Sequence, residues 1–197
     1  PILKRCYESA PTSYQRKGTF MQCARCRCLM VPTSWGGFRC ELDRCRRDGR
    51  TTTGTELPPN RGGVFQLSRP LRMFITSPGL AETDLEQALI TRYGIKPEMW
   101  PNYDAYDLRV ALPGGQAWAV DVKDRVNPVL LARTTRPFRR KPPYDRAFLV
   151  VPRYRFEDND AYGRIFARHL PGELADQITL LDDQAFLKLV ASVRNKT

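Results

Sequence analysis

The chain has 197 residues, of which 42% are hydrophobic, and this is enough for one ordinary core and a small additional module. Lysine and arginine outnumber aspartate and glutamate by 32 to 21, so the net charge is +11. This charge favours a polyanionic partner, nucleic acid above all, over an acidic membrane surface. No apolar run approaches the roughly 20 residues that a membrane span needs, and no secretory signal is visible, so we expect a cytoplasmic protein with no membrane partner.

The first 60 residues hold all six cysteines and few apolar runs. Two pairs, Cys23-x2-Cys26 and Cys40-x4-Cys45, have the spacing of two ligand knuckles, and four thiolates make a structural Zn²⁺ site. Cys28 can replace Cys26, and Cys6 can join another set, so the spacing leaves the quartet open. Without a secretory signal, zinc is favoured over a disulfide framework. The metal would supply the folding free energy that so few apolar residues cannot.

Basic and aromatic residues crowd the same segment. The arginines are Arg25, Arg27, Arg39, Arg44, Arg46, Arg47 and Arg50. They suggest that the module grips a phosphate backbone, and a protein-docking platform is the alternative. Trp35 and Phe38 can stack on bases or can form a miniature core.

A stretch rich in Gly and Pro, residues 51–63, predicts a linker, and we place the domain boundary after residue 60. Residues 1–60 are then a zinc-binding module with its linker, and residues 61–197 are the main domain. A helix is predicted to begin at Ser77 and to stop at Gly94, with Leu85 and Leu89 on its apolar face.

Two strands, 106–112 and 116–123, are predicted to form a hairpin around Gly114, which places Asp107 opposite Asp121. Strand side chains alternate, so Asp107, Asp121 and Lys123 share one face. The other, apolar face is expected to meet the core and holds Tyr106, Leu108, Val110, Leu112, Trp118, Val120 and Val122.

The rest of the chain alternates helix and strand patterns. A helix is predicted near 128–133, a strand at 147–151, a helix at 160–169, a strand at 178–181 and a helix at 183–193. This order predicts an α/β fold with a central mixed sheet flanked by helices, in addition to the small N-terminal module.

The facing carboxylates of the hairpin predict a metal site. Opposed residues have Cβ atoms about 4.5–5.5 Å apart, which is close enough for two carboxylates to share Mg²⁺ or Mn²⁺, and the cation would relieve their repulsion. Lys123 projects from the same face and can orient a water for phosphodiester hydrolysis. The alternative is a solvated polar face on which Lys123 neutralises its neighbours.

The segment Tyr106-Asp107-Leu108, followed by Trp118-Ala119-Val120-Asp121-Val122-Lys123, resembles the PD-(D/E)xK nuclease superfamily, which includes restriction endonucleases and nucleases of prokaryotic defence systems. The resemblance covers residues 75–195, although no Pro precedes Asp107. It implies a restriction-endonuclease-like fold in which Asp107 and Asp121 bind the catalytic metal, the Val122 carbonyl adds a ligand and Lys123 orients the water. It further implies that Glu82, rather than Glu86 one turn later, supports the metal or the water.

These observations predict a metal-dependent endonuclease that hydrolyses DNA in a prokaryotic defence or processing system. A non-cleaving nucleic-acid-binding or assembly subunit and a nuclease acting on RNA are the alternatives. Double-strand cleavage would require a homodimer or a larger defence complex. The basic loop 133–141 is placed to hold a duplex backbone, or it is simply solvated. His169, the only histidine, is interpreted as a helix-end residue.

Overall fold

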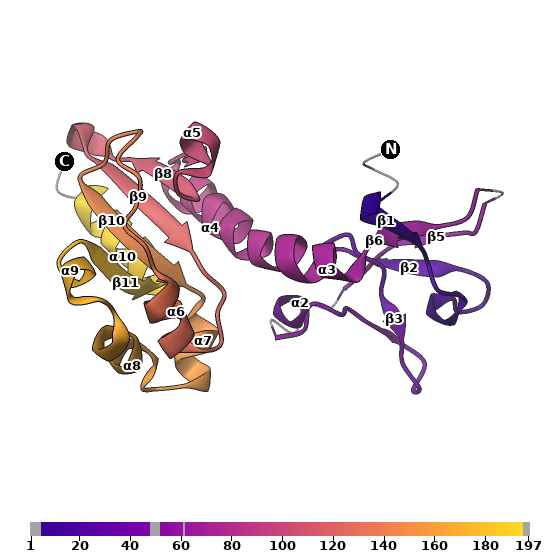
Figure 1. The fold of residues 1–197 in the computed structure, drawn as a ribbon. Helices are drawn as coiled ribbons and strands as arrows, with labels where there is room; N and C mark the ends of the chain where they lie inside the picture. The colour runs from indigo at the N-terminus through magenta and orange to yellow at the C-terminus, as the bar shows by residue number, and fades with distance from the viewer. Residues whose placement is uncertain (1–4, 48–51, 61, 195–197) are drawn as a thin grey trace. The chain divides into compact units, whose positions relative to one another are not determined.

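The structure is a computed structural model that describes residues 5–47, 52–60 and 62–194. The chain divides into two compact units, Pro1–Leu80 and Ala81–Thr197 (Figure 1). Among the described helices, none has both the length and the apolar character that crossing a membrane requires.

Short antiparallel ribbons build the first unit. The pairs are β1 (Tyr7–Ser9) with β6 (Phe65–Leu67), β2 (Phe20–Cys23) with β5 (Thr53–Leu57), and β3 (Val31–Pro32) with β4 (Phe38–Arg39). The short helical segments are η1 (Thr12–Tyr14), α2 (Asp43–Arg47), α3 (Arg69–Leu71) and the π-helical η2 (Arg72–Thr76). Its buried core is small and consists of Met21, Cys23, Met30, Cys40, Leu42 and Cys45.

The boundary between the units differs from the one expected after residue 60. The stretch interpreted as a linker contains β5, and β6 pairs with β1 near the start of the chain. Arg72 is also tied to the first unit, because its buried guanidinium contacts Glu8 at 3.1 Å and Glu41 at 3.0 Å. The low apolar content of residues 51–63 suggested a linker. The pairing of β5 with β2 and of β6 with β1 instead makes this region part of the first unit.

A five-stranded mixed sheet forms the centre of the second unit, in the order β11-β10-β9-β8-β7. The strands are β7 (Glu98–Met99), β8 (Leu108–Ala111), β9 (Ala117–Val122), β10 (Arg146–Val151) and β11 (Ile178–Asp182). Strands β7, β8 and β9 are antiparallel neighbours, whereas β9, β10 and β11 run parallel. The expected mixed α/β architecture with a central mixed sheet is therefore confirmed.

Helices connect the parallel strands, because parallel neighbours need a crossover connection. The first crossover, from β9 to β10, contains α6 (Pro128–Thr134). The side chain of Asn127 caps α6 by accepting hydrogen bonds from the N–H groups of Val129 and Leu130. The second crossover, from β10 to β11, contains α7 (Arg153–Asp158), α8 (Tyr162–His169) and α9 (Gly172–Ala175).

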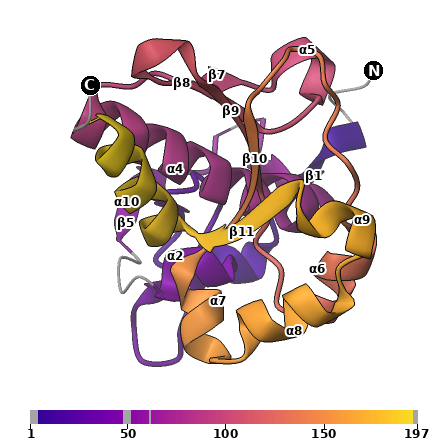
Figure 2. The same ribbon diagram turned by 90° about the vertical axis from the view of Figure 1, so that its left-hand side faces the viewer.

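Both faces of the sheet are covered, as Figure 2 shows. One face packs against α4 (Ser77–Tyr93) and α10 (Asp183–Arg194), which contribute Leu85, Leu89, Phe186 and Val190. The other face packs against α6 and α8, and its buried residues include Leu131, Tyr162, Phe166 and Leu149. Only the first face of the hairpin was expected to meet the core, but Ala119 of the hairpin is buried in this second cluster as well.

The predicted helix and hairpin are present. Helix α4 ends at Tyr93, and Gly94 has φ +66°, a left-handed conformation that suits glycine after a helix. The hairpin has the predicted register, since Leu108 pairs with Val120 and Arg109 pairs with Ala119. The helix predicted from residue 160 begins at Tyr162, and the last strand and helix lie where expected.

Tyr106 departs from the predicted alternation. It was expected on the same face as Leu108, but it belongs to the opposite cluster and packs on Phe138 and Tyr144, with ring centroids 6.3 and 5.7 Å away. Strand β8 begins only at Leu108, so strict alternation does not reach Tyr106.

Candidate active site

Asp107 immediately precedes β8 instead of lying within the ladder opposite Asp121. Its carbonyl oxygen accepts a hydrogen bond from the N–H of Trp100 at 2.8 Å. Its carboxylate Oδ2 accepts one from the N–H of Val122 at 2.6 Å. The N–H and C=O of one strand residue point to the same edge, so the Val122 carbonyl is directed toward the side of β9 on which Asp107 lies.

Lys123 connects the two carboxylates. Its Nζ lies 3.0 Å from Asp107 Oδ2 and 3.1 Å from Asp121 Oδ1. The second oxygens, Asp107 Oδ1 and Asp121 Oδ2, have no hydrogen bond or ion pair with the residues that the structure describes. Each carboxylate therefore keeps one oxygen available for another ligand.

Burial and neighbouring charge perturb this group. Burial and, after it, the charge of Asp121 raise the pKa of Asp107 to about 6, although Lys123 and the Val122 N–H act in the opposite direction. For Lys123, burial acts against the charged form, but the charges of Asp121 and Asp107 outweigh it and raise the Lys123 pKa. One ammonium thus faces two carboxylates, and a bound cation would compensate for the excess negative charge.

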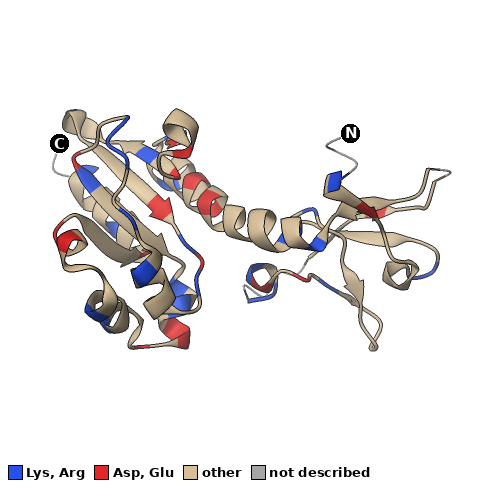
Figure 3. Cartoon of the chain, in the orientation of Figure 1, with Lys and Arg blue, Asp and Glu red and all other residues tan. Residues whose placement is uncertain are grey.

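Glu82 lies on α4 near this group but not on the wall of the adjoining cavity. Burial, followed by the charge of Asp107, raises the Glu82 pKa, and the charge of Lys123 lowers it. Its Oε2 accepts a hydrogen bond from the indole N–H of Trp100 at 2.8 Å. Acidic residues on α4 and toward the end of β9 are visible in Figure 3. No contact among the described residues connects Glu86 with the site.

The segment after β9 is held by a buried ion pair. Asp124 Oδ1 lies 2.7 Å from Arg155 Nε, and the two side chains are 7% and 9% exposed. The Tyr154 hydroxyl also donates to Asp124, and the Tyr162 hydroxyl donates to the carbonyl of Arg125 at 2.7 Å. These contacts position the backbone that follows Lys123, so we regard Asp124 as a structural residue.

A cavity of about 400 Å³ adjoins the carboxylates. Asp107, Asp121 and Lys123 contribute to its wall. Its cationic lining residues are Arg125, Arg136 and Arg139, of which the last two belong to the predicted basic loop. The guanidinium groups of Arg125 and Arg139 form no ion pair with the described residues, so their charges are available to a phosphate. Sequence reasoning missed Arg125, although it stands only two residues after Lys123.

A strained turn, also missed from the sequence, leads into Asp107. Trp100, Asn102, Tyr103 and Asp104 have φ values of +48°, +48°, +58° and +67°, in and beside α5 (Pro101–Asp104). A left-handed conformation costs about 1–2 kcal/mol for each residue other than glycine. The turn is nevertheless anchored, since Asn102 Nδ2 donates to the Lys141 carbonyl at 3.1 Å. The sequence signal that could have indicated this turn was the group of aromatic, Asn and Asp residues between the predicted helix and the predicted strand.

The first unit gathers four cysteines. Ligand atoms of Cys23, Cys26, Cys40 and Cys45 all lie within 4.8 Å of one another, and the Cys26 and Cys40 sulfurs are 3.5 Å apart. A tight turn brings the first pair together, because the N–H of Arg27 donates to the Cys23 carbonyl and Arg27 has φ +62°. This is the quartet expected from the spacing.

The two remaining cysteines differ in their relation to the quartet. Hydrogen bonds with Cys28 first, then with Cys40 and Cys45, lower the pKa of Cys26, so the Cys28 thiol also lies beside the cluster. Cys6 is half-buried and is not a member of the group.

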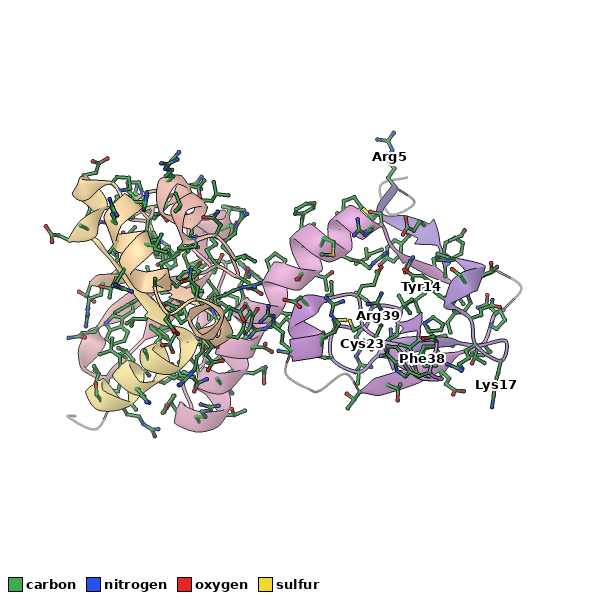
Figure 4. All side chains as sticks on the ribbon, turned by 90° about the horizontal axis from the view of Figure 1, so that it is seen from below. Arg5, Tyr14, Lys17, Cys23, Phe38 and Arg39 are labelled. Atoms are coloured by element: carbon green, nitrogen blue, oxygen red, sulfur yellow. The ribbon has the colours of Figure 1, made fainter. Side chains whose placement is uncertain are left out.

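The arginines and aromatic residues of the first unit have mixed roles. Arg46 and Arg47 pair with Asp43, and Arg25 donates to the Arg44 carbonyl, whereas Arg50 lies outside the described residues. Phe38 packs against the cysteine cluster, and Figure 4 shows it near Cys23. Trp35 is 84% exposed. Of the two expected aromatic roles, Phe38 takes the core role, and only Trp35 is free to stack on a ligand.

His169 lies at the end of α8, where its Nδ1 is 2.9 Å from the Ile165 carbonyl. It does not contribute to the cavity wall. The interpretation of His169 as a helix-end residue therefore agrees with its position.

Comparison with known proteins connects the second unit to a family. A family model described as "REase associating with pPIWI_RE" matches residues 79–197. In this description, REase stands for restriction endonuclease. No curated protein and no solved structure matches the chain. The matched region contains the mixed sheet, the carboxylate group and the cavity, so the comparison and the geometry concern the same unit. The chain belongs to the restriction-endonuclease-like family that associates with pPIWI_RE.

Proposed function

We propose that the second unit is a metal-dependent endonuclease that hydrolyses phosphodiester bonds of DNA, with Asp107, Asp121 and Lys123 at its active site. The observation that carries this proposal is the convergence of these three side chains on one cavity wall, with Lys123 3.0 and 3.1 Å from the two carboxylates. Each carboxylate also has one oxygen without a partner among the described residues, which suits shared binding of a hard cation.

The donor set fits Mg²⁺ or Mn²⁺. Carboxylate and carbonyl oxygens are the ligands that these ions prefer, and Asp107, Asp121 and the Val122 carbonyl would supply them. When bound, such a cation lowers the pKa of water and neutralises charge on a phosphate. The raised Asp107 pKa agrees with a site that has more negative charge than its own lysine compensates.

The residues around the carboxylates have separable tasks. Lys123, kept charged by its two partners, would hold and orient the attacking water and stabilise negative charge on the phosphate. Arg125 and Arg139 would bind phosphate oxygens along the cavity wall. Glu82, whose carboxylate is oriented by Trp100, would support the water from α4.

The family description also suggests a biological setting. We propose that the protein acts in a complex with a pPIWI_RE partner, within a prokaryotic defence or processing system. The net charge of +11 favours nucleic acid as the further component. One active site cuts one strand, so double-strand cleavage would need a second copy or a partner with its own site.

For the first unit we propose a structural Zn²⁺ bound by Cys23, Cys26, Cys40 and Cys45. Four thiols within 4.8 Å of one another fit a tetrahedral ion with Zn–S distances of about 2.3 Å. Three of the six residues in the core of this unit, Cys23, Cys40 and Cys45, are cysteines of this quartet, so the metal would hold the unit together.

The nuclease proposal is tested by incubating supercoiled plasmid, single-stranded DNA and RNA with the full chain in Mg²⁺, Mn²⁺ or EDTA. Asp121→Asn and Lys123→Ala are each expected to lower cleavage by about 100-fold or more, because each removes a ligand or a charge at the reacting phosphate. Matched controls are Asp176→Asn and Lys188→Ala, which change exposed residues away from the cavity. Both controls are expected to cut as the unaltered protein does.

The outcomes separate the alternatives. Cleavage that survives in Asp121→Asn would reject this active site, and preferential cleavage of RNA would replace DNA as the substrate. DNA that is bound but not cut in any metal, with and without a pPIWI_RE partner, would favour a non-cleaving assembly subunit. Dependence of cutting on that partner would support the proposed complex.

A further inference from the structure

The turn at Trp100–Asp104 presents two aromatic side chains to solvent beside the candidate active site. Tyr103 is 95% exposed and Trp100 is 49% exposed, which places both among the exposed large apolar residues. Asp104, the last residue of this turn, contributes to the cavity wall with Asp107 and Asp121. The turn that carries the two exposed aromatic residues therefore borders the cavity through Asp104.

The backbone of this turn is held firmly on both sides. The N–H of Trp100 donates to the Asp107 carbonyl at 2.8 Å, and the N–H of Ala105 donates to the Pro101 carbonyl at 3.0 Å. The Asn102 amide reaches the Lys141 carbonyl, and the Trp100 indole reaches Glu82. An exposed ring on a pinned backbone loses little conformational entropy when it binds a ligand.

Packing does not account for the conformation of Tyr103. Its left-handed backbone, φ +58°, is unfavourable for a bulky residue, and its ring gains almost no burial in return. Strained residues of this kind persist where the surrounding structure holds them for a purpose, and they cluster at functional sites. The Tyr103 ring is directed to solvent, and stabilising the fold does not require an exposed ring in this conformation.

The chemistry around the turn identifies the class of ligand. The same cavity is lined by Arg125 and Arg139, whose guanidinium groups form no ion pair with any residue that the structure describes. Lys141, whose carbonyl accepts the hydrogen bond from Asn102, ends the basic loop 133–141. Aromatic rings next to cations that follow a phosphate backbone are the combination that binds single-stranded nucleic acids. An apolar protein surface would leave these arginines without partners.

We propose that Tyr103, with Trp100 beside it, stacks on an unpaired base of the DNA strand whose phosphate lies in the cavity. In a continuous duplex both faces of each base are already stacked, so a duplex does not offer such a base. The substrate class is therefore DNA with an unpaired segment at the cleavage site, either single-stranded or tailed. This inference rests on the proposed function, because it concerns the substrate of the same site.

The test measures binding without cleavage. Full-length protein, in buffer without added divalent cations or chelator, is titrated into a single-stranded oligonucleotide and into a blunt duplex of equal length, and fluorescence anisotropy reports the affinity. Tyr103→Ala is expected to weaken binding of the single strand by about 5- to 100-fold, the effect of losing one base stack. Binding of the duplex is expected to change by less than about twofold. Tyr103→Phe keeps the ring and is expected to bind as the unaltered protein does.

A spectroscopic readout distinguishes stacking from a general loss of affinity. A single strand with 2-aminopurine in place of one base is expected to lose fluorescence on binding when the analogue reaches Tyr103. The quenching should persist in Tyr103→Phe and disappear in Tyr103→Ala. The matched control is Tyr7→Ala, which removes an exposed tyrosine from β1 of the first unit.

Folding is controlled by Tyr103→Gly, which relieves the left-handed strain while removing the ring. This variant is expected to be at least as stable as the unaltered protein and still to lose the single-strand preference. The inference would be overturned if Tyr103→Ala bound the single strand as tightly, and quenched 2-aminopurine as strongly, as the unaltered protein does. That result would also be expected if this surface contacted a protein partner instead of DNA. Intact stacking without cleavage in Mg²⁺ or Mn²⁺, both with and without a pPIWI_RE partner, would instead reject the nuclease proposal and leave the stacking inference supported.

Discussion

Both units bring side chains of metal-ligand type together, but the two groups rest on different parts of the fold. In the first unit, three of the four clustered cysteines are themselves part of a buried core of six residues. In the second unit, the carboxylates lie at the ends of strands whose sheet is covered by helices on both faces. The first candidate metal site is thus inseparable from its fold, whereas the second is placed on a fold that has its own core.

The largest expected effect is removal of metal from the first unit. Cys40→Ser, or a strong chelator, is expected to release Zn²⁺ and unfold this unit, because structural zinc contributes about 10–16 kcal/mol in small metal-dependent domains. Metal analysis of the full chain and hydrogen exchange of each unit would measure this. The second unit is expected to keep its exchange protection.

Cys6→Ser is the control for this experiment, since Cys6 is not a member of the cluster. It should leave one Zn²⁺ per chain. Full protection of residues 20–45 in metal-free protein would contradict the comparison between the units.

A smaller effect is expected when the buried ion pair of the second unit is broken. Asp124→Asn leaves Arg155 charged and buried, and we expect a loss of about 3–5 kcal/mol in the free energy of unfolding of this unit. Thermal unfolding followed by circular dichroism would measure the loss. Zinc content should not change, because the first unit does not contain this pair.

Glu157→Gln provides the comparison for Asp124→Asn. It breaks the exposed pair with Arg153, whose side chains are 56% and 61% exposed, and the expected cost is under about 1 kcal/mol. If Glu157→Gln lowered the free energy of unfolding as much as Asp124→Asn does, burial would not determine how much these ion pairs contribute to stability.

The smallest expected effect is on the titration of Asp107. In metal-free protein, Asp107 is expected to titrate near pH 6, and Asp121→Asn should lower this value because it removes a neighbouring negative charge. Carboxyl carbon NMR of labelled protein would report both values. A value near 4 in the unaltered protein would mean that Asp107 is more solvated than the structure shows.

The same titration affects stability with a defined sign. The Asp107 pKa is higher in the folded than in the unfolded protein, so its contribution is full below about pH 4 and is lost as the pH rises through about 6. In the metal-free protein, this loss should be smaller in Asp121→Asn. Urea unfolding at pH 4 to 7 would compare the two proteins.

Local patterns carried the sequence predictions that the structure confirms. The helix end at Gly94 and the hairpin register around Gly114 follow from periodicity and glycine conformations, which act over a few residues. The grouping of Asp107, Asp121 and Lys123 could be predicted for the same reason, since two paired strands bring them close. Tyr106 could not, because the point at which β8 begins depends on the contacts of the preceding turn. The expected helix start at Ser77 is not a helix N-terminus, because helical residues from Arg69 onward lead directly into it.

The sequence by itself determined the alternation of helices and strands and the hairpin register that brings the two carboxylates and Lys123 close, because these features depend on patterns within short segments. The cysteine spacing left the quartet open, and the fold gathers Cys23, Cys26, Cys40 and Cys45. Only the tertiary structure decided that Phe65–Leu67 joins β1, that Trp100 orients Glu82 and that Arg125 and Arg139 meet at one cavity. These contacts join residues that are far apart in the chain, or residues whose side chains are oriented by an irregular backbone segment. Their geometry is selected by the packing of the whole unit, which no local periodicity records.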